Sequence, residues 1–175
     1  TNVDNKLLKE VLHNEAKDDA LIIPAYLAQN KEELILPYNY HNMVITGTMW
    51  GCNRGSYRVG HLLYRLAKEG LLVAYGQASA FDYLGNAYKG QADKYGDATD
   101  TLISLQRDAG ISLIFHSYEH LVQGLPTSRF AESITAGAVI ISDDHPFLRK
   151  FFGDNILYIN SFTPTEKMYE QIKSH

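Results

Sequence analysis

Cysteine is almost absent from this sequence. The 175 residues include one, Cys52, which excludes a disulfide within the chain and a zinc site built from several cysteines. A lone cysteine fits a reducing compartment, and no secretory signal is recognisable at the start of the sequence. We therefore expect a cytoplasmic protein.

Long hydrophobic runs and a strong charge bias are missing as well. The longest apolar stretch, AGAVIIS, has the length of a strand and is far too short for a membrane helix. The formal net charge of −4 gives no sign of a basic surface for nucleic acids. We expect neither a membrane span nor a nucleic-acid partner. The length and the 45% hydrophobic content indicate one domain of ordinary size with a real core.

The residue pattern becomes regular at about residue 42. Residues 1–41 hold one segment with helical spacing and apolar pieces broken by Pro24 and Pro37, and we interpret them as a lead-in or linker. From 42 to 175, short apolar segments alternate with segments of helical periodicity. Strands are predicted at 43–48, 71–76, 111–117, 138–144 and 155–160. Helices are predicted at 58–70, 99–110, 128–137, 145–154 and 163–175, the last with Thr163 as cap and Pro164 in first position. Residues 77–98 are polar, rich in glycine and poorly periodic.

The predicted strands are apolar throughout, which is typical of strands buried on both faces of a parallel sheet. Alternation of strands and helices predicts an open, mostly parallel Rossmann-like α/β sheet with helices on both faces. Ligands of such sheets bind at the carboxyl ends of the strands. Polar residues that directly follow strands are therefore candidates for a site, namely those at 47–54, 75–77, 116–119 and 142–144.

The stretch TGTMWGCNRG, residues 46–55, places glycines between a strand and a helix. Its first half suggests the fingerprint of short-chain dehydrogenases, but Asn53 stands where the next glycine is needed, and no acidic residue follows the second strand. Such a loop can still bind phosphate through backbone amides, with charge from Arg54 or Arg58. A plain turn with solvated arginines explains the same residues equally well.

Two histidines four residues apart occur in HSYEH, at 116 and 120. Glu119 is misplaced for the H-E-x-x-H zinc motif, and the segment follows a strand directly, so we expect a loop and no metal. His116, at the end of a strand, can contact a ligand phosphate.

The stretch GLPTSRFAESITAGAVIISDD, residues 124–144, predicts a helix that Thr127 or Ser128 caps. Glu132 is not explained by a capping box, because neither cap is followed by Glu or Gln three residues later. Arg129 and the helix N-terminus favour a diphosphate, and Glu132 can accept both hydroxyls of a ribose. Phe130 and Ile134 are then expected to face the sheet. The alternative is an exposed Arg129–Glu132 ion pair that contributes only a few tenths of a kcal/mol.

The segment SRFAESITAGAVIISDDHPFLRKFFGDNILYIN resembles the donor-binding half of GT-B glycosyltransferases, in particular the group that includes spore-coat-type transferases. VITGTMWGCNRG and LLVAYG are similar to its first strand and loop and to its second strand. The resemblance implies that Glu132 binds the ribose of a nucleotide sugar, that Arg129 and the loop at 47–54 face the diphosphate, and that residues 75–77 lie near the base.

The same resemblance implies a metal-independent enzyme without a cofactor, whose acceptor is bound by an N-terminal domain beyond this chain. Many retaining members carry E-x7-E, but Gly124 stands eight residues before Glu132, which leaves retention or inversion open, and no catalytic residue is assigned. The expected function is donor binding within a glycosyltransferase. The alternative is a non-catalytic α/β module that binds a phosphorylated ligand or a partner protein. The expected donor-binding residues are Gly47, Thr48, Arg54, Tyr75, Gly76, His116, Thr127, Ser128, Arg129 and Glu132.

Overall fold

Five parallel strands form one sheet in the computed structural model, which describes residues 42–47, 59–92 and 98–174. The strands are β1 (Asn42–Gly47), β2 (Leu72–Gly76), β3 (Gly110–Ile114), β4 (Val139–Asp143) and β5 (Leu157–Ile159). Their order across the sheet is β2-β1-β3-β4-β5, and each neighbouring pair runs parallel. The predicted open parallel α/β sheet is confirmed. The expectations for residues 1–41, Thr48 and Arg54 concern positions outside the described residues.

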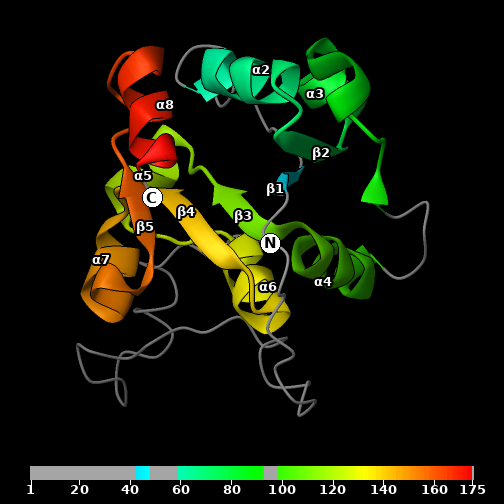
Figure 1. Ribbon diagram of the computed structural model, residues 1–175. Helices are drawn as coiled ribbons and strands as arrows, with labels where there is room; N and C mark the ends of the chain where they lie inside the picture. Colours follow the sequence, from blue (N-terminus) through cyan, green and yellow to red (C-terminus); the bar gives the residue numbers. More distant parts are fainter. Residues whose placement is uncertain (1–41, 48–58, 93–97, 175) are drawn as a thin grey trace.

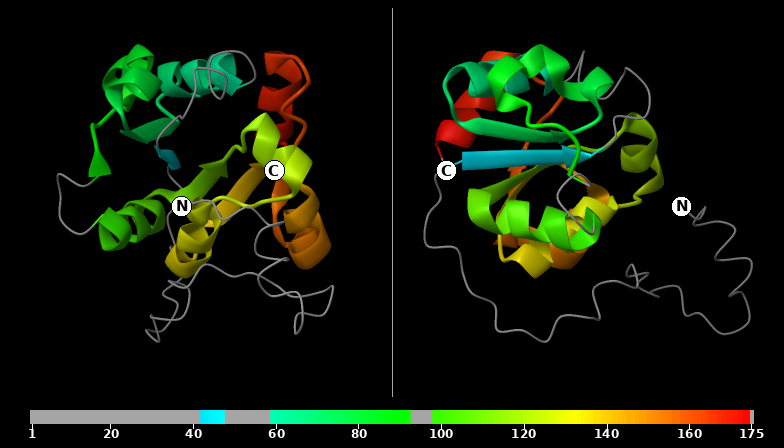
Figure 2. Two further views of the ribbon diagram at one scale, coloured as in Figure 1. Left: turned by 180° about the vertical axis from the view of Figure 1, so that it is seen from behind. Right: turned by 90° about the vertical axis from the view of Figure 1, so that its right-hand side faces the viewer.

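Helices cover both faces of the sheet (Figures 1 and 2). Helices α2 and α8 pack together on one face, and α4 and α6 pack together on the other, where α7 also lies. This arrangement follows from the right-handed crossovers that connect parallel strands. The helical elements are α2 (Gly60–Lys68), α3 (Ala78–Phe81), η3 (Asp82–Ala87), α4 (Ala98–Ala109), α5 (Tyr118–Gln123), α6 (Ser128–Ala136), α7 (Pro146–Phe152), η5 (Gly153–Asn155) and α8 (Thr165–Lys173).

Residues 88–90 extend the sheet beyond β2. The backbone amide of Lys89 donates to the carbonyl of Ala74 at 2.9 Å, and the amide of Gly76 donates to the carbonyl of Gly90 at 2.9 Å. With this segment counted as an additional strand, the order matches that of dinucleotide-binding Rossmann folds. The order reverses between β1 and β3, so the connections from their carboxyl ends leave in opposite directions. Ligands of open α/β sheets bind at this switch point.

The two faces of the sheet have different cores. The larger apolar cluster lies under α2 and α8 and includes three fully buried leucines of α2 together with Phe81 and Met168. The cluster under α6 and α7 is smaller and centres on Phe130, Ile140 and Leu148. Three polar side chains are also buried between α4, α6 and β3: Gln106, Ser112 and Ser133 are 0–3% exposed. Buried polar groups must be hydrogen-bonded to be tolerated, and here they are bonded to one another.

Three local expectations were wrong, and one segment without a predicted element is partly helical. Residues 118–123 form a helix, α5, because Ser117 caps its first turn and Gly124 ends it. Residues 78–87, for which no element was predicted, form α3 and η3 with a kink at Gly85, and Phe81 and Leu84 are buried in the core. Helix α8 begins at Thr165 after Pro164, and the hydroxyl of Thr163 donates to the carbonyl of Asn160. Ile134 does not face the sheet: it is 36% exposed.

Candidate functional site

Arg129 of α6 reaches the carboxyl end of β1. Its guanidinium group lies against Gly47, the last residue of β1. A Cβ atom added at residue 47 would overlap the guanidinium group. Helix α6 follows β3 and α5 in the chain, so the N-terminus of α6 lies at the same edge of the sheet. The structure thus brings together two predicted site residues that are 82 positions apart in the sequence (129 minus 47).

Gly47 and Gly76 end neighbouring strands and lie opposite each other in the parallel register. A side chain at residue 76 would overlap the carbonyl oxygen of Gly47, so close packing of two strand ends accounts for Gly76. A side chain at residue 47 would instead overlap the end of the flexible Arg129 side chain. Both glycines have positive φ, +134° at Gly47 and +152° at Gly76, which side chains adopt only with strain.

The contact between Gly47 and Arg129 gives a direct prediction. Alanine at residue 47 should displace the guanidinium group and weaken binding of an anionic ligand at the end of β1 nearly as much as loss of Arg129 itself. Gly70→Ala is the matched control, since Gly70 also has positive φ (+71°) but no atom within 4 Å of the added carbon. Both variants should lose about 1–3 kcal/mol of stability through backbone strain. Calorimetric titration of both variants with the same diphosphate ligand measures the two affinities. Equal affinities of Gly47→Ala and Gly70→Ala would contradict the prediction.

Glu132 lies one turn further into α6 and is buried, with 9% of its surface exposed. Its Oε2 accepts a hydrogen bond of 3.3 Å from the side-chain amide of Gln106. Burial raises the pKa of the Glu132 carboxyl above its usual value, while the positive charge of Arg129 and hydrogen bonds from Gln106 and Ser128 act in the opposite direction. An exposed surface pair of Arg129 and Glu132 is therefore not what the structure contains.

Thr127 occupies the N-cap position of α6, as the sequence suggested, but its side chain makes no capping hydrogen bond. The residue is 6% exposed, and its Oγ1 atom has no hydrogen-bond partner within the part of the chain that the structure describes. Ser128 is the first residue of the helix and is half-buried. The first turn of α6 thus combines backbone amides, two hydroxyl groups and Arg129, which is a combination suited to an anion.

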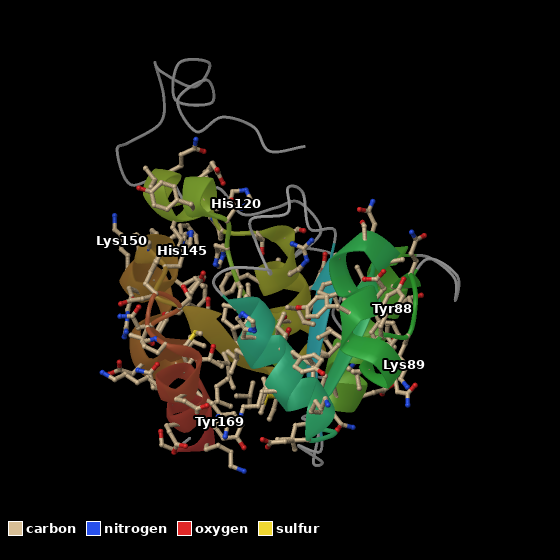
Figure 3. All side chains as sticks on the ribbon, turned by 90° about the horizontal axis from the view of Figure 1, so that it is seen from above. Tyr88, Lys89, His120, His145, Lys150 and Tyr169 are labelled. Carbon is tan, nitrogen blue, oxygen red and sulfur yellow. The ribbon has the colours of Figure 1, made fainter. Side chains whose placement is uncertain are left out.

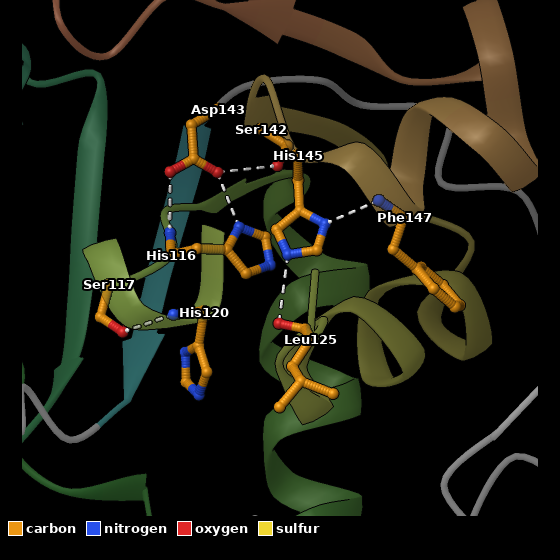
Figure 4. Close-up of polar contacts among 8 residues, drawn as sticks. All are labelled: His116, Ser117, His120, Leu125, Ser142, Asp143, His145 and Phe147. Atoms are coloured by element: carbon orange, nitrogen blue, oxygen red, sulfur yellow. Dashed lines mark hydrogen bonds and ion pairs between the residues drawn. The ribbon is translucent and has the colours of Figure 1, made fainter. Parts of the chain in front are cut away.

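His116 follows β3 and is held by Asp143, the last residue of β4 (Figure 4). Its Nδ1–H donates to Oδ1 of Asp143 at 2.6 Å, and its backbone amide donates to Oδ2 at 3.0 Å. Both side chains are at most 1% exposed. Asp143 therefore fixes the orientation of the imidazole ring and ties the ends of β3 and β4 together. Asp143 lies in the predicted 142–144 segment, but its pairing with His116 was not anticipated.

His145 packs against His116, with ring centroids 4.1 Å apart, and the ring centroid of His120 lies 6.5 Å from that of His116. Figure 3 shows His120 and His145 close together, next to α5 and α7. Burial lowers the pKa of His145 to about 4, so its ring is neutral at physiological pH. Its Nδ1 accepts from the amide of Phe147 at 3.2 Å, which leaves Nε2–H to donate to the carbonyl of Leu125 at 3.1 Å.

The bond from His145 to Leu125 anchors the loop that precedes α6. The amide of Leu125 also donates to the carbonyl of His120 at 3.0 Å. The loop is thus bonded at both polar groups of Leu125, and the N-terminus of α6 is held in place before any ligand arrives. Preorganisation of this kind lowers the cost of ordering a binding site. His120 and His145 were not predicted as parts of the site.

The remaining predicted residues lie at the end of β2. Tyr75 and Gly76 are half-buried, and the hydroxyl of Tyr88 donates to the carbonyl of Gly76 at 2.9 Å. In the register of the sheet they stand opposite Thr46 and Gly47, so they are adjacent to the end of β1. Gln106, which no sequence pattern singles out, contacts Glu132 directly. No pattern in the sequence links α4 with α6, so only their packing reveals this contact.

Comparison of the chain with models of protein families, with curated proteins and with solved structures finds no match. Over the described ranges, no group of three or more His, Cys, Asp or Glu side chains has the arrangement of a metal site. In the same ranges, every helix is too short or too polar to cross a membrane. The chemistry of the strand ends and of α6 is consequently the basis for assigning a function.

Proposed function

We propose that this chain is the donor-binding domain of a metal-independent, nucleotide-sugar-dependent glycosyltransferase. The observation that supports this most strongly is the placement of Arg129 over the end of β1, with the buried carboxyl of Glu132 one turn behind it on the same helix. The pair lies where the strand order reverses, which is the usual ligand position in open parallel sheets.

The phosphate half of the proposed ligand fits the first turn of α6. A diphosphate has negative charge and many acceptor oxygens, and it would be bound by the helix amides, the Thr127 and Ser128 hydroxyls and the Arg129 guanidinium. The same groups would stabilise the negative charge that develops on a departing nucleoside diphosphate. Transfer of the sugar would then depend on electrostatic stabilisation of the leaving group, without a metal ion.

The sugar half of the nucleoside fits Glu132. A carboxylate accepts two hydrogen bonds side by side, which matches the neighbouring hydroxyls of a ribose. Burial of an ionised carboxyl group is unfavourable, and a ligand that donates two further hydrogen bonds would compensate part of that cost. Tyr75 and Gly76, at the end of the adjacent strand, would lie on the side of the base.

Titration calorimetry with UDP-, GDP-, ADP- and CDP-linked sugars tests the proposal. We expect one nucleotide to bind with at least about micromolar affinity, and the nucleoside diphosphate to retain most of that affinity. Binding of inorganic pyrophosphate and simple phosphate esters, without preference for a nucleoside, would favour the alternative of a non-catalytic module for phosphorylated ligands. Absence of binding to every nucleotide, also with the intact parent protein, would refute the assignment.

Glu132→Gln should weaken nucleotide binding while making the domain more stable. The affinity should fall by about 1.5–3 kcal/mol, the range for a hydrogen bond to a charged group. Because burial raises the pKa of Glu132 above its usual value of 4.5 in the folded protein, the ionised carboxylate reduces stability at neutral pH. The stability gained in the variant should be absent below about pH 4.5, grow as the pH rises towards the folded-state pKa and then stay constant.

Chemical denaturation of both proteins between about pH 4 and pH 8 measures the stability difference, and calorimetry measures the affinity. Unchanged affinity in a folded variant would remove the ribose role of Glu132. A stability difference that does not change with pH would show that Glu132 titrates normally in the folded protein.

A further inference from the structure

Glu132 is the end of a buried chain of hydrogen bonds that crosses from β3 to α4. The hydroxyl of Ser133 lies 2.8 Å from that of Ser112 in β3 and 2.5 Å from Oε1 of Gln106 in α4. The amide nitrogen of Gln106 then reaches Oε2 of Glu132 at 3.3 Å. Gln106 and Ser133 have no exposed surface and Ser112 has 3%.

The order of donors in this chain follows from the charge of Glu132. An ionised carboxylate can only accept, so the NH₂ side of the Gln106 amide must face it. Oε1 of Gln106 then points towards the hydroxyl of Ser133, which also lies 2.8 Å from the hydroxyl of Ser112 and 2.8 Å from the carbonyl of Arg129. The three neutral side chains therefore present one donor to one oxygen of Glu132. The three side chains Gln106, Ser133 and Ser112 make no hydrogen bond to the other carboxylate oxygen of Glu132.

We propose that Gln106 is a positioning residue that sets the ribose specificity of the site, by holding the carboxylate of Glu132 in the orientation that accepts both ribose hydroxyls. The inference rests on the proposed donor-binding function. Gln106 is fully buried and therefore acts on the ligand through Glu132, never by direct contact. A fixed carboxylate distinguishes a ribose from a 2′-deoxyribose because the missing hydroxyl leaves one aligned acceptor without its donor. A carboxylate that can rotate discriminates less.

The position of the chain supports this role over a purely structural one. The opposite face of the sheet is filled with apolar side chains, whereas these three polar residues occupy the interior between α4, α6 and β3. Apolar residues of the same shape would pack there without any need for hydrogen bonds. The polar chain ends at the one carboxyl group that the candidate site contains on α6, which is where a positioning device is useful.

The test compares a nucleoside diphosphate with its 2′-deoxy counterpart. The probe is whichever of UDP, GDP, ADP and CDP binds the wild-type chain, together with the matching deoxynucleotide. We expect wild type to prefer the ribose form, and Gln106→Met, which keeps the shape but removes the donor, to reduce this preference by about three- to tenfold. Ser133→Ala should change the preference in the same direction by a smaller factor. Ile103→Val, one turn earlier on α4, is the control and should leave the ratio unchanged.

The pH dependence of binding is a second measurement. A purely structural role of Gln106 would leave the acid limb of the binding profile unchanged. Loss of the donor from Gln106 should raise the pKa of Glu132 further, so the acid limb of the binding profile should move to higher pH in Gln106→Met and stay in place in Ile103→Val. If Gln106→Met does not fold, the weaker variant Ser133→Ala decides the question with the same two measurements.

The possible failures are distinguishable. No binding of any nucleotide to wild type overturns the proposed function and this inference with it. Binding with a ribose preference that Gln106→Met and Ser133→Ala both retain in full overturns the role of Gln106 alone and leaves the proposed function standing. If Ile103→Val reduces the ribose preference as much as Gln106→Met does, the effect comes from a general loss of stability. This outcome also overturns the role of Gln106.

Discussion

Replacing Arg129 with alanine should remove almost all affinity for a nucleoside diphosphate. The guanidinium lies over the end of β1, where the proposed phosphate groups are bound, and the site loses both its charge and its paired donors. Arg129→Lys should retain part of the affinity, because lysine keeps the charge but cannot form the two parallel hydrogen bonds. A nucleoside monophosphate should respond less than the diphosphate, since it presents less charge to the same group. Calorimetric titration of the three proteins with both ligands measures these differences.

The dependence of affinity on ionic strength distinguishes a contact between Arg129 and phosphate from an ion pair within the protein. Higher ionic strength should weaken binding to the wild type more than binding to Arg129→Ala, since the variant lacks the charge that salt screens. Arg149→Ala is a suitable control: Arg149 pairs with Asp144 at 2.7 Å on the exposed surface, and its loss should leave affinity unchanged. If Arg129 serves only as the partner of the buried Glu132 carboxyl, alanine will lower stability and affinity will not respond.

Replacing Asp143 with alanine should destabilise the fold by about 3–5 kcal/mol, the usual effect of removing one partner from a buried hydrogen-bonded pair. The substitution leaves the backbone amide and Nδ1–H of His116 without their acceptor in a region that is closed to solvent. Asp143→Asn should lose less, since its carbonyl oxygen can still accept one of the two bonds. Chemical denaturation followed by circular dichroism measures the three free energies of unfolding.

The neighbouring residue gives a matched control for this experiment. Asp144 carries the same carboxyl group but is exposed and pairs with Arg149 at the surface. Asp144→Ala should change stability by less than about 1 kcal/mol. Equal effects at the two positions would mean that the bonds between Asp143 and His116 contribute no more than a surface pair.

The sheet could be predicted from the sequence because its signal is local. Each strand is a short apolar run, and each major helix repeats apolar residues on one side, as in α2 with Leu62, Leu63 and Leu66. Short helices cannot be predicted from the same local signal, because they contain too few apolar repeats. Helix α5 has six residues and follows β3 closely, so its apolar spacing is too brief to detect, although Ser117 and Gly124 mark its ends.

The site could be predicted only in part. Arg129 and Glu132 stand out in the sequence because neither is needed for capping, but the contact of Arg129 with Gly47 is seen only in the structure. The burial of Ser133 in place of Ile134 was not predictable, since it depends on Ser112 and Gln106 as partners from other elements. The pairing of His116 with Asp143 likewise joins two strand ends that are 27 positions apart. Such contacts arise from tertiary packing, which no spacing rule along one segment encodes.

The contact between Gly47 and Arg129 also constrains how this chain can diverge. Any side chain at residue 47 competes for the volume that the guanidinium fills, so the two positions must be inherited together while the function is kept. Descendants that lose the arginine are released from the steric part of this constraint, and only the positive φ then still favours glycine. Among relatives of this chain, glycine at the end of the first strand and arginine in the first turn of α6 should therefore be retained or lost as a linked pair.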